Sequence, residues 1–149
     1  MRPASRFVSR CLVAGMSIWA SIVTEMPSAK GDSVVTNQSK ALQVVIGDPR
    51  VQAFMHPEID ERFPLQVNLP EGVGVEAFAG IDLGVPSVFL KRGTAPDPAR
   101  ANLIVSMLEL DNADGTVKFS LPIEGLVGSA QMRLENGSWV VKSMQLVEQ

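Results

Sequence analysis

The sequence predicts an α+β fold, in which short N-terminal helices pack on an antiparallel sheet of four to six strands. Three observations support this prediction. Apolar residues recur at helical spacing over residues 39–56, and from residue 63 onward they alternate with a period of two. An Asn-Gly pair at positions 136–137 joins the last two alternating segments, which is typical of a tight β-hairpin.

The composition excludes several classes of protein. The chain has 149 residues, 46% apolar and 19% charged, as expected for one globular domain. It has one cysteine, Cys11, one histidine, His56, and no tyrosine. Because Cys11 lies in a predicted leader, these counts exclude a disulfide framework and a zinc site or catalytic dyad of Cys and His. The net charge of −3 argues against a nucleic-acid partner, and we expect no cofactor and no metal.

Residues 1–29 have the pattern of a secretory signal peptide. Three arginines in the first ten residues precede an uncharged stretch over residues 11–24, and small residues follow it. As a helix this stretch would span roughly 21 Å, short of the ~30 Å hydrocarbon core of a membrane. We predict cleavage after Ala29, with Ala20 as the second choice; an uncleaved anchor and a buried helix are the alternatives.

Cleavage would leave residues 30–149 as a single α+β domain without cysteine. This segment carries 10 basic and 15 acidic residues, a net charge of about −5. At this length a core can stabilise the fold without disulfides. The predicted location is periplasmic or extracellular, with no membrane association after cleavage.

The helical part of the prediction covers residues 39–56. Residues 30–37 are polar and are predicted to lead into it, after which Leu42, Val45 and Ile46 share a face. Asp48 followed by Pro49 is a strong start signal, because proline lacks the N–H that the first turn of a helix leaves unpaired. We therefore expect two short helices, or one broken helix.

The middle of the chain holds less regular strands. Residues 64–70 alternate between prolines and predict a strand, and residues 85–91 predict another. Residues 71–84 are rich in glycine and receive no assignment, and residues 93–100 are predicted as a loop. Residues 103–110 are apolar in both phases, which predicts a central strand covered on both faces.

The last 33 residues give the clearest pattern. Apolar residues alternate from Val117 to Ile123 and again over residues 130–135, and Asn136-Gly137 predicts a two-residue type I′ turn. This turn sets the register, with Leu134 opposite Trp139, Met132 opposite Val141 and Arg133 opposite Val140. The later apolar residues fall out of phase with Trp139, which predicts a bulge near Ser143.

The ending LENGSWVVKSMQLVEQ, residues 134–149, resembles the closing hairpin of small nuclear transport factor 2-like (NTF2-like) or cystatin-like domains. The resemblance covers about 40 residues. It implies a curved sheet that wraps an N-terminal helix, and a pocket between helix and sheet. It implies no particular activity, because function depends on sites built onto a fold.

Few residues are candidates for chemistry. His56 is either a general base or a histidine at a helix end, where a cation complements the helix dipole. Asp82 is the acid of a mostly apolar segment, and with His56 it is a candidate to line a helix–sheet pocket. Residues 58–61, beside Arg62, hold three acids and are predicted as a solvated surface, and residues 111–115 are predicted as a hairpin turn rather than a calcium loop. No catalytic residue is assigned.

Residues 124–129, EGLVGS, are predicted to connect two strands, and such a connection should be polar. Leu126 and Val127 lie side by side in it. Either they fold back onto the core, or they contact a protein partner or a second copy of the chain, as exposed apolar patches do. They are our candidate partner-binding residues.

Together these features predict an exported, non-enzymatic binding or accessory domain. The alternative is a small enzyme or ligand-binding protein that uses a helix–sheet pocket with a buried carboxylate. A closed helix–sheet interface favours the first hypothesis, and a deep pocket that contains Asp82 or His56 favours the second.

The leader generates a prediction about processing. The exported protein should lack the first 20–29 residues, because a signal peptidase removes segments of this pattern. Intact-mass measurement of the protein recovered outside the cytoplasm tests this. Recovery there with Met1 retained would contradict cleavage.

Overall fold

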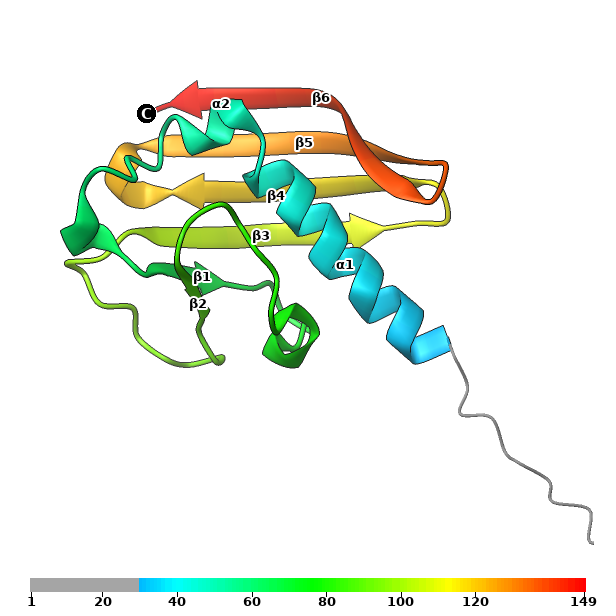
Figure 1. Ribbon diagram of the computed structural model, residues 1–149, viewed down its shortest axis with the longest axis horizontal. Helices are drawn as coiled ribbons and strands as arrows, with labels where there is room; N and C mark the ends of the chain where they lie inside the picture. The colour runs from blue at the N-terminus through cyan, green and yellow to red at the C-terminus, as the bar shows by residue number, and fades with distance from the viewer. Residues whose placement is uncertain (1–29) are drawn as a thin grey trace, which may run out of the picture.

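The computed structural model describes residues 30–149, so the predicted signal peptide and Cys11 lie outside the described residues. One long helix crosses one face of a six-stranded sheet (Figure 1). The elements are α1 (Lys30–Ile46), α2 (Pro49–Gln52), β1 (Leu65–Asn68), β2 (Ser87–Phe89), β3 (Asn102–Leu110), β4 (Asp114–Leu121), β5 (Leu126–Glu135) and β6 (Ser138–Glu148), with short 3₁₀ turns η1 (Asp60–Arg62), η2 (Val75–Phe78) and η3 (Pro122–Glu124).

The predicted break between two helices is confirmed at Gly47, where α1 ends and α2 follows. The Asp48 carboxylate accepts a 2.9 Å hydrogen bond from the backbone N–H of Arg50, and Pro49 occupies the first turn of α2. The prediction that residues 30–37 only lead into the helix is wrong, because α1 begins at Lys30. A helix needs apolar residues only where it contacts the sheet, so a polar segment can extend it beyond that contact.

The sheet is mixed, with strand order β2-β1-β3-β4-β5-β6. β1 pairs in parallel with both β2 and β3, and the remaining pairs are antiparallel. The α+β class and the six strands agree with the prediction, but the fully antiparallel sheet does not. The connections over residues 69–86 and 90–101 are long enough to return the chain to the same end of the sheet, which parallel pairing requires.

β3 corrects the prediction of a strand covered on both faces. Its outward residues Ile104, Ser106 and Glu109 are exposed, and Ile104 retains 37% of its accessible surface. The register shifts between Val105, which pairs with Phe119, and Met107, which pairs with Lys118. At this β-bulge Ser106 has no partner residue on β4, and the positions that face the core shift by one residue. Apolar residues therefore occur at both odd and even positions of β3, although only one face of the strand is buried.

The C-terminal hairpin agrees with the prediction. Asn136 and Gly137 have φ values of 52° and 78°, and Leu134 pairs with Trp139 as expected. Trp139 is buried. The predicted bulge is also present, since Met132 pairs with Val141 and the preceding Gln131 pairs with Ser143.

The predicted loop over residues 124–129 is wrong. β5 begins at Leu126, and the actual connection is the 3₁₀ turn η3 followed by Gly125, whose φ is 60°. Leu126 is therefore buried in the core, whereas Ile123, predicted to continue the inward alternation, lies in η3 and is exposed. Gly128 is a strand glycine: it pairs with Phe119, and a Cβ atom there would lie 2.2 Å from Phe119 Cζ.

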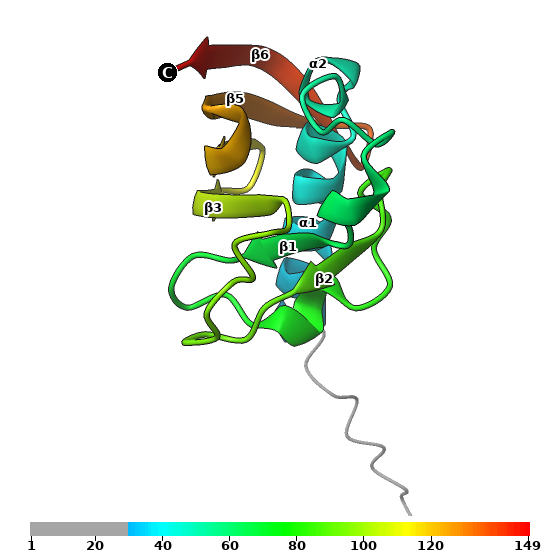
Figure 2. The same ribbon diagram turned by 90° about the vertical axis from the view of Figure 1, so that its left-hand side faces the viewer.

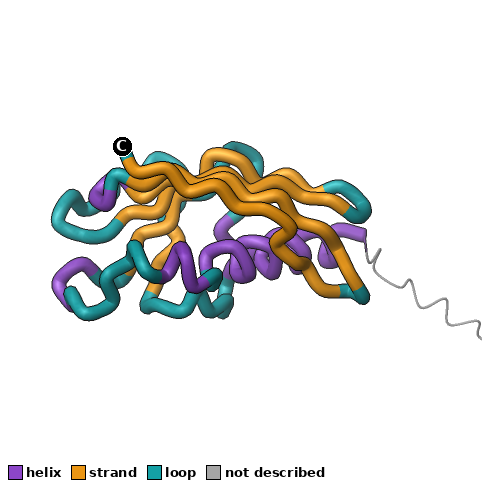
Figure 3. The backbone as a smooth tube through the Cα atoms, turned by 90° about the horizontal axis from the view of Figure 1, so that it is seen from above, coloured by secondary structure: helices purple, strands orange, loops and turns teal. Residues whose placement is uncertain are grey.

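The core lies between the sheet and α1, as the two layers in Figure 3 show. Four apolar residues near the C-terminal end of α1 are fully buried: Ala41, Leu42, Val45 and Ile46. Residues 69–86, unassigned from the sequence, contribute further buried side chains from the same side of the sheet, and η2 contacts α1 directly. Figure 2 shows the sheet with α1 and α2 on one side of it. The buried side chains of this loop are Phe78, Leu83 and Val85.

Because Gly128 lies so close to Phe119, we expect that adding a single methyl group at position 128 destabilises the fold. Gly128→Ala should lower the free energy of unfolding by roughly 1–3 kcal/mol, because the phenyl ring must move. Ser129→Ala, at the next position of the same strand, should change it by less than about 0.5 kcal/mol.

Denaturant unfolding measures both variants. Combining Gly128→Ala with Phe119→Leu, which removes the ring, should cost less than the sum of the two single changes. Equal costs for Gly128→Ala and Ser129→Ala would show that the ring is placed differently.

Candidate functional site

Asp82 and His56, the two residues predicted to line a pocket, contact different parts of the chain. Asp82 is exposed in the loop after η2, where its Oδ1 accepts a 2.8 Å hydrogen bond from the backbone N–H of Gly84. It is therefore not the buried carboxylate that a helix–sheet pocket would need. His56 lies after α2, with a φ of 47°, and contacts a different set of charged residues.

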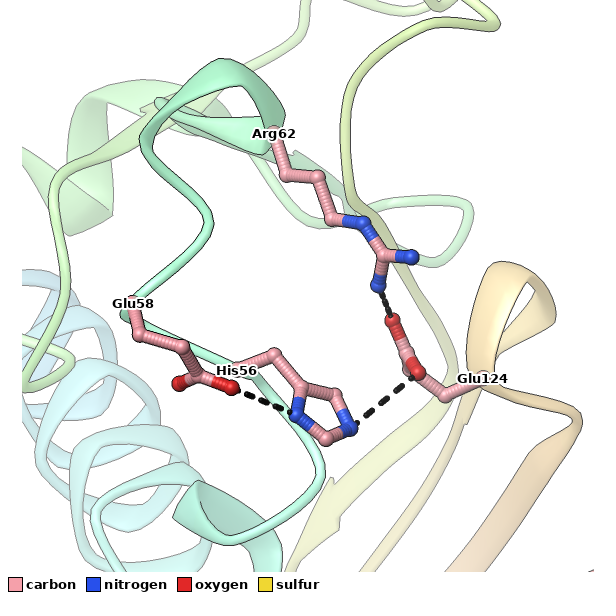
Figure 4. Close-up of polar contacts among 4 residues, drawn as sticks. All are labelled: His56, Glu58, Arg62 and Glu124. Carbon is pink, nitrogen blue, oxygen red and sulfur yellow. Dashed lines mark hydrogen bonds and ion pairs between the residues drawn. The ribbon is translucent and has the colours of Figure 1, made fainter.

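Four charged residues form what we call the His56 cluster: His56, Glu58, Arg62 and Glu124 (Figure 4). The two ring nitrogens of His56 face different carboxylates. Nδ1 lies 3.0 Å from Glu58 Oε1, and Nε2 lies 3.6 Å from Glu124 Oε2. Arg62 donates a hydrogen bond from Nη1 to the other oxygen of Glu124.

Burial within the His56 cluster is uneven. The Glu124 side chain is only 14% exposed and that of Arg62 28%, whereas Glu58 is 66% exposed. Glu124 and Arg62 thus form a partly buried ion pair, and Glu58 lies at its solvent side. A partly buried carboxylate needs such a partner, because desolvation penalises an unpaired charge.

The pKa of Glu58 is lowered from its ordinary value. The main cause is a hydrogen bond from its own backbone N–H, and the hydrogen bond with His56 adds to it. Both interactions favour the carboxylate in the folded state. Their contribution to stability is therefore present above the ordinary pKa of a glutamate and is lost as the pH falls through the lowered pKa.

The His56 cluster connects segments that are distant in sequence. His56 and Glu58 precede β1, Arg62 ends η1, and Glu124 lies in η3, the connection between β4 and β5. Its contacts hold the loop after α2 against the end of the sheet. The prediction of a solvated acidic surface over residues 58–61 agrees with their exposure, but it missed the pairing of Arg62. Nothing local could reveal that pairing, because 62 positions separate Arg62 from Glu124.

The second candidate site is the face of β3–β6 opposite α1, which we call the outer face. No element within residues 30–149 lies over its centre, as Figure 3 shows. Within residues 30–149, a loop covers this side over β1: Gln66 is buried there and exchanges two hydrogen bonds with the backbone of Asp97, at 2.9 and 2.7 Å. Beyond β1, the side chains of β3–β6 that point away from the helix reach solvent.

A row of three apolar residues and one serine crosses one end of the outer face. Ile104 pairs with Ser120, Ser120 with Val127, and Val127 with Val147. We call these four residues the outer row. The exposed fractions of its three apolar members are 37% for Ile104, 38% for Val127 and 57% for Val147. Of the two candidate partner-binding residues, Val127 therefore lies in the exposed outer row, whereas Leu126 belongs to the core.

The chain has no match among known protein families, curated proteins or solved structures. The resemblance to NTF2-like or cystatin-like domains stays a prediction. Within residues 30–149, the structure contains no helix that is both long and apolar enough to span a bilayer. In the same part of the chain, no three His, Cys, Asp or Glu side chains are grouped to hold a metal ion.

We expect the partly buried ion pair of the His56 cluster to stabilise the fold more than an exposed ion pair does. Glu124→Gln should lower the free energy of unfolding by roughly 1–2 kcal/mol, because it leaves Arg62 partly buried without its anion. Glu71→Gln breaks the 2.8 Å pair between Glu71 and Arg92, both more than three-quarters exposed, and should have almost no effect. Denaturant unfolding compares the two. Equal effects would show that Glu124 and Arg62 do not depend on each other.

Proposed function

We propose that this protein is an exported, non-enzymatic binding domain that contacts another protein through the outer face of its sheet. The proposal rests on one observation: the outer row places three exposed apolar side chains in register across β3, β5 and β6. Exposed apolar side chains that gather at one end of a face mark protein contacts more often than isolated exposed residues do.

The closed inner face supports binding from outside rather than inside. Ala41, Leu42, Val45 and Ile46 of α1 have no accessible surface, and the loop over residues 69–86 covers more of the same side. A helix–sheet pocket would require some of these side chains to line open space. Between the two hypotheses from the sequence, this favours interaction through the surface.

The His56 cluster supports a structural role in the same function. Arg62 neutralises Glu124, and each nitrogen of His56 faces a carboxylate. These contacts hold η3, which lies next to the first residues of β5 and thus to Val127. The cluster therefore stabilises the end of the sheet at which the outer row lies.

Export is the part of the proposal that rests on the sequence. The basic residues, uncharged stretch and small-residue exit of residues 1–29 direct a chain across a membrane. We place the protein in the periplasm or outside the cell.

Paired lysine substitutions test the outer row. Val127→Lys with Val147→Lys should reduce crosslinking of the exported protein to other proteins, or to itself, by about tenfold or more, because charges then replace the apolar contact. Val44→Lys is the matched control: Val44 has the same 38% exposure as Val127 but lies on α1.

Crosslinking in cells followed by mass spectrometry gives the measurement. The thermal midpoints of the variants should match that of the wild type, since all three valines are exposed. An unchanged crosslinking pattern in the double variant, or equal loss in Val44→Lys, would contradict the proposed function.

A further inference from the structure

We infer that the partner of the outer face is a second copy of this chain, with the two sheets packed face to face about a two-fold axis. This inference rests on the proposed function of the outer face and specifies its occupant. It is drawn from the charges, the shape and the edges of the sheet.

The outer face is electrically balanced, although the chain is acidic. Six charged side chains lie on it, three of each sign, whereas residues 30–149 together carry a net charge of about −5. The excess negative charge therefore lies elsewhere, and two copies meet the least repulsion when they approach through this face. The charged residues of the outer face are Glu109, Asp114, Glu135, Lys118, Arg133 and Lys142.

Four of the six charges are already paired within one copy. Arg133 lies 3.1 Å from Asp114, and Lys142 lies 2.8 Å from Glu135. The other two, Glu109 and Lys118, have no ion-pair partner in the described part of the chain. In a two-fold interface each contact occurs twice, so Lys118 of one copy can pair with Glu109 of the other and the reverse. One unpaired cation and one unpaired anion on the same face are what such an arrangement requires.

The shape of the outer face suits the packing of two sheets. Between its charged and apolar residues it carries small hydroxyl side chains, which let a second sheet approach to the usual distance of about 10 Å. Four strands of about eight residues present roughly 500 Å² in each copy, so two copies cover about 1,000 Å², the lower limit for a specific interface. The small residues are Ser106, Thr116, Ser120, Ser129, Ser138 and Ser143.

The edges of the sheet are less suited to pairing with a second copy. The β2 edge has only three residues. The β6 edge is longer, but the bulge at Lys142 interrupts it. Short edges and bulges are devices that block strand addition. The outer face thus remains the surface on which a second copy fits.

Sedimentation velocity tests the inference. The sample is the exported protein, purified as cells process it. The purified wild-type chain should change from monomer to dimer between about 1 μM and about 1 mM. Lys118→Glu should weaken the dimer by roughly tenfold or more, because it replaces a positive charge on each face with a negative one. Glu109→Lys combined with Lys118→Glu restores the balance and should restore the dimer. Val44→Lys should leave it unchanged.

The outcomes separate this inference from the proposed function. A monomer at every concentration, or a dimer that Lys118→Glu leaves intact, would overturn the second-copy inference. If crosslinking to a different protein still depended on the outer row, the proposed function would stand. If substitutions in the outer row changed neither the dimer nor any crosslink, both would be wrong.

Discussion

A single long helix must cover a wide sheet, and the rest of this structure depends on that constraint. Six strands span about 29 Å, whereas a helix with its side chains is about 10–12 Å across. α1 can therefore bury only part of the inner face. The loop over residues 69–86 buries more of it, with Phe78, Leu83 and Val85 in the same core as α1. A loop that contains the short 3₁₀ turn η2 thus serves as the second half of the layer that covers the sheet.

This constraint also explains which parts of the fold could be predicted from the sequence. The hairpin around Asn136-Gly137 depends on neighbours in the chain, and its register followed from turn chemistry and alternation. The cap at Asp48 is local in the same way. The parallel pairing of β1 with β2 and β3 depends on where long connections return, and no short pattern encodes it.

Two of the wrong predictions share a cause, because each depended on contacts between strands that the sequence pattern does not show. In β3 the bulge at Ser106 shifted the phase, and a strand with one buried face looked as if both were buried. Residues 124–129 contain two glycines, Gly125 and Gly128, but only Gly125 has a positive φ. Gly128 is small because Phe119 lies across from it. For both candidate sites the missing information was pairing across strands or loops: Arg62 with Glu124, and the four members of the outer row.

The contact between Gly128 and Phe119 also restricts how this chain can evolve. A larger residue at 128 has no room while the ring is present, and a smaller residue at 119 leaves a cavity while the glycine is present. Gly115 is constrained in a similar way, since a Cβ there would lie 2.6 Å from Leu110 and 3.4 Å from Trp139. A substitution at position 128 is tolerated best when position 119 changes with it. In sequences that diverge from this one, the residue at 128 should therefore become larger when the residue at 119 becomes smaller. An alignment of such sequences would show this covariation, and the covarying positions would reveal the strand register.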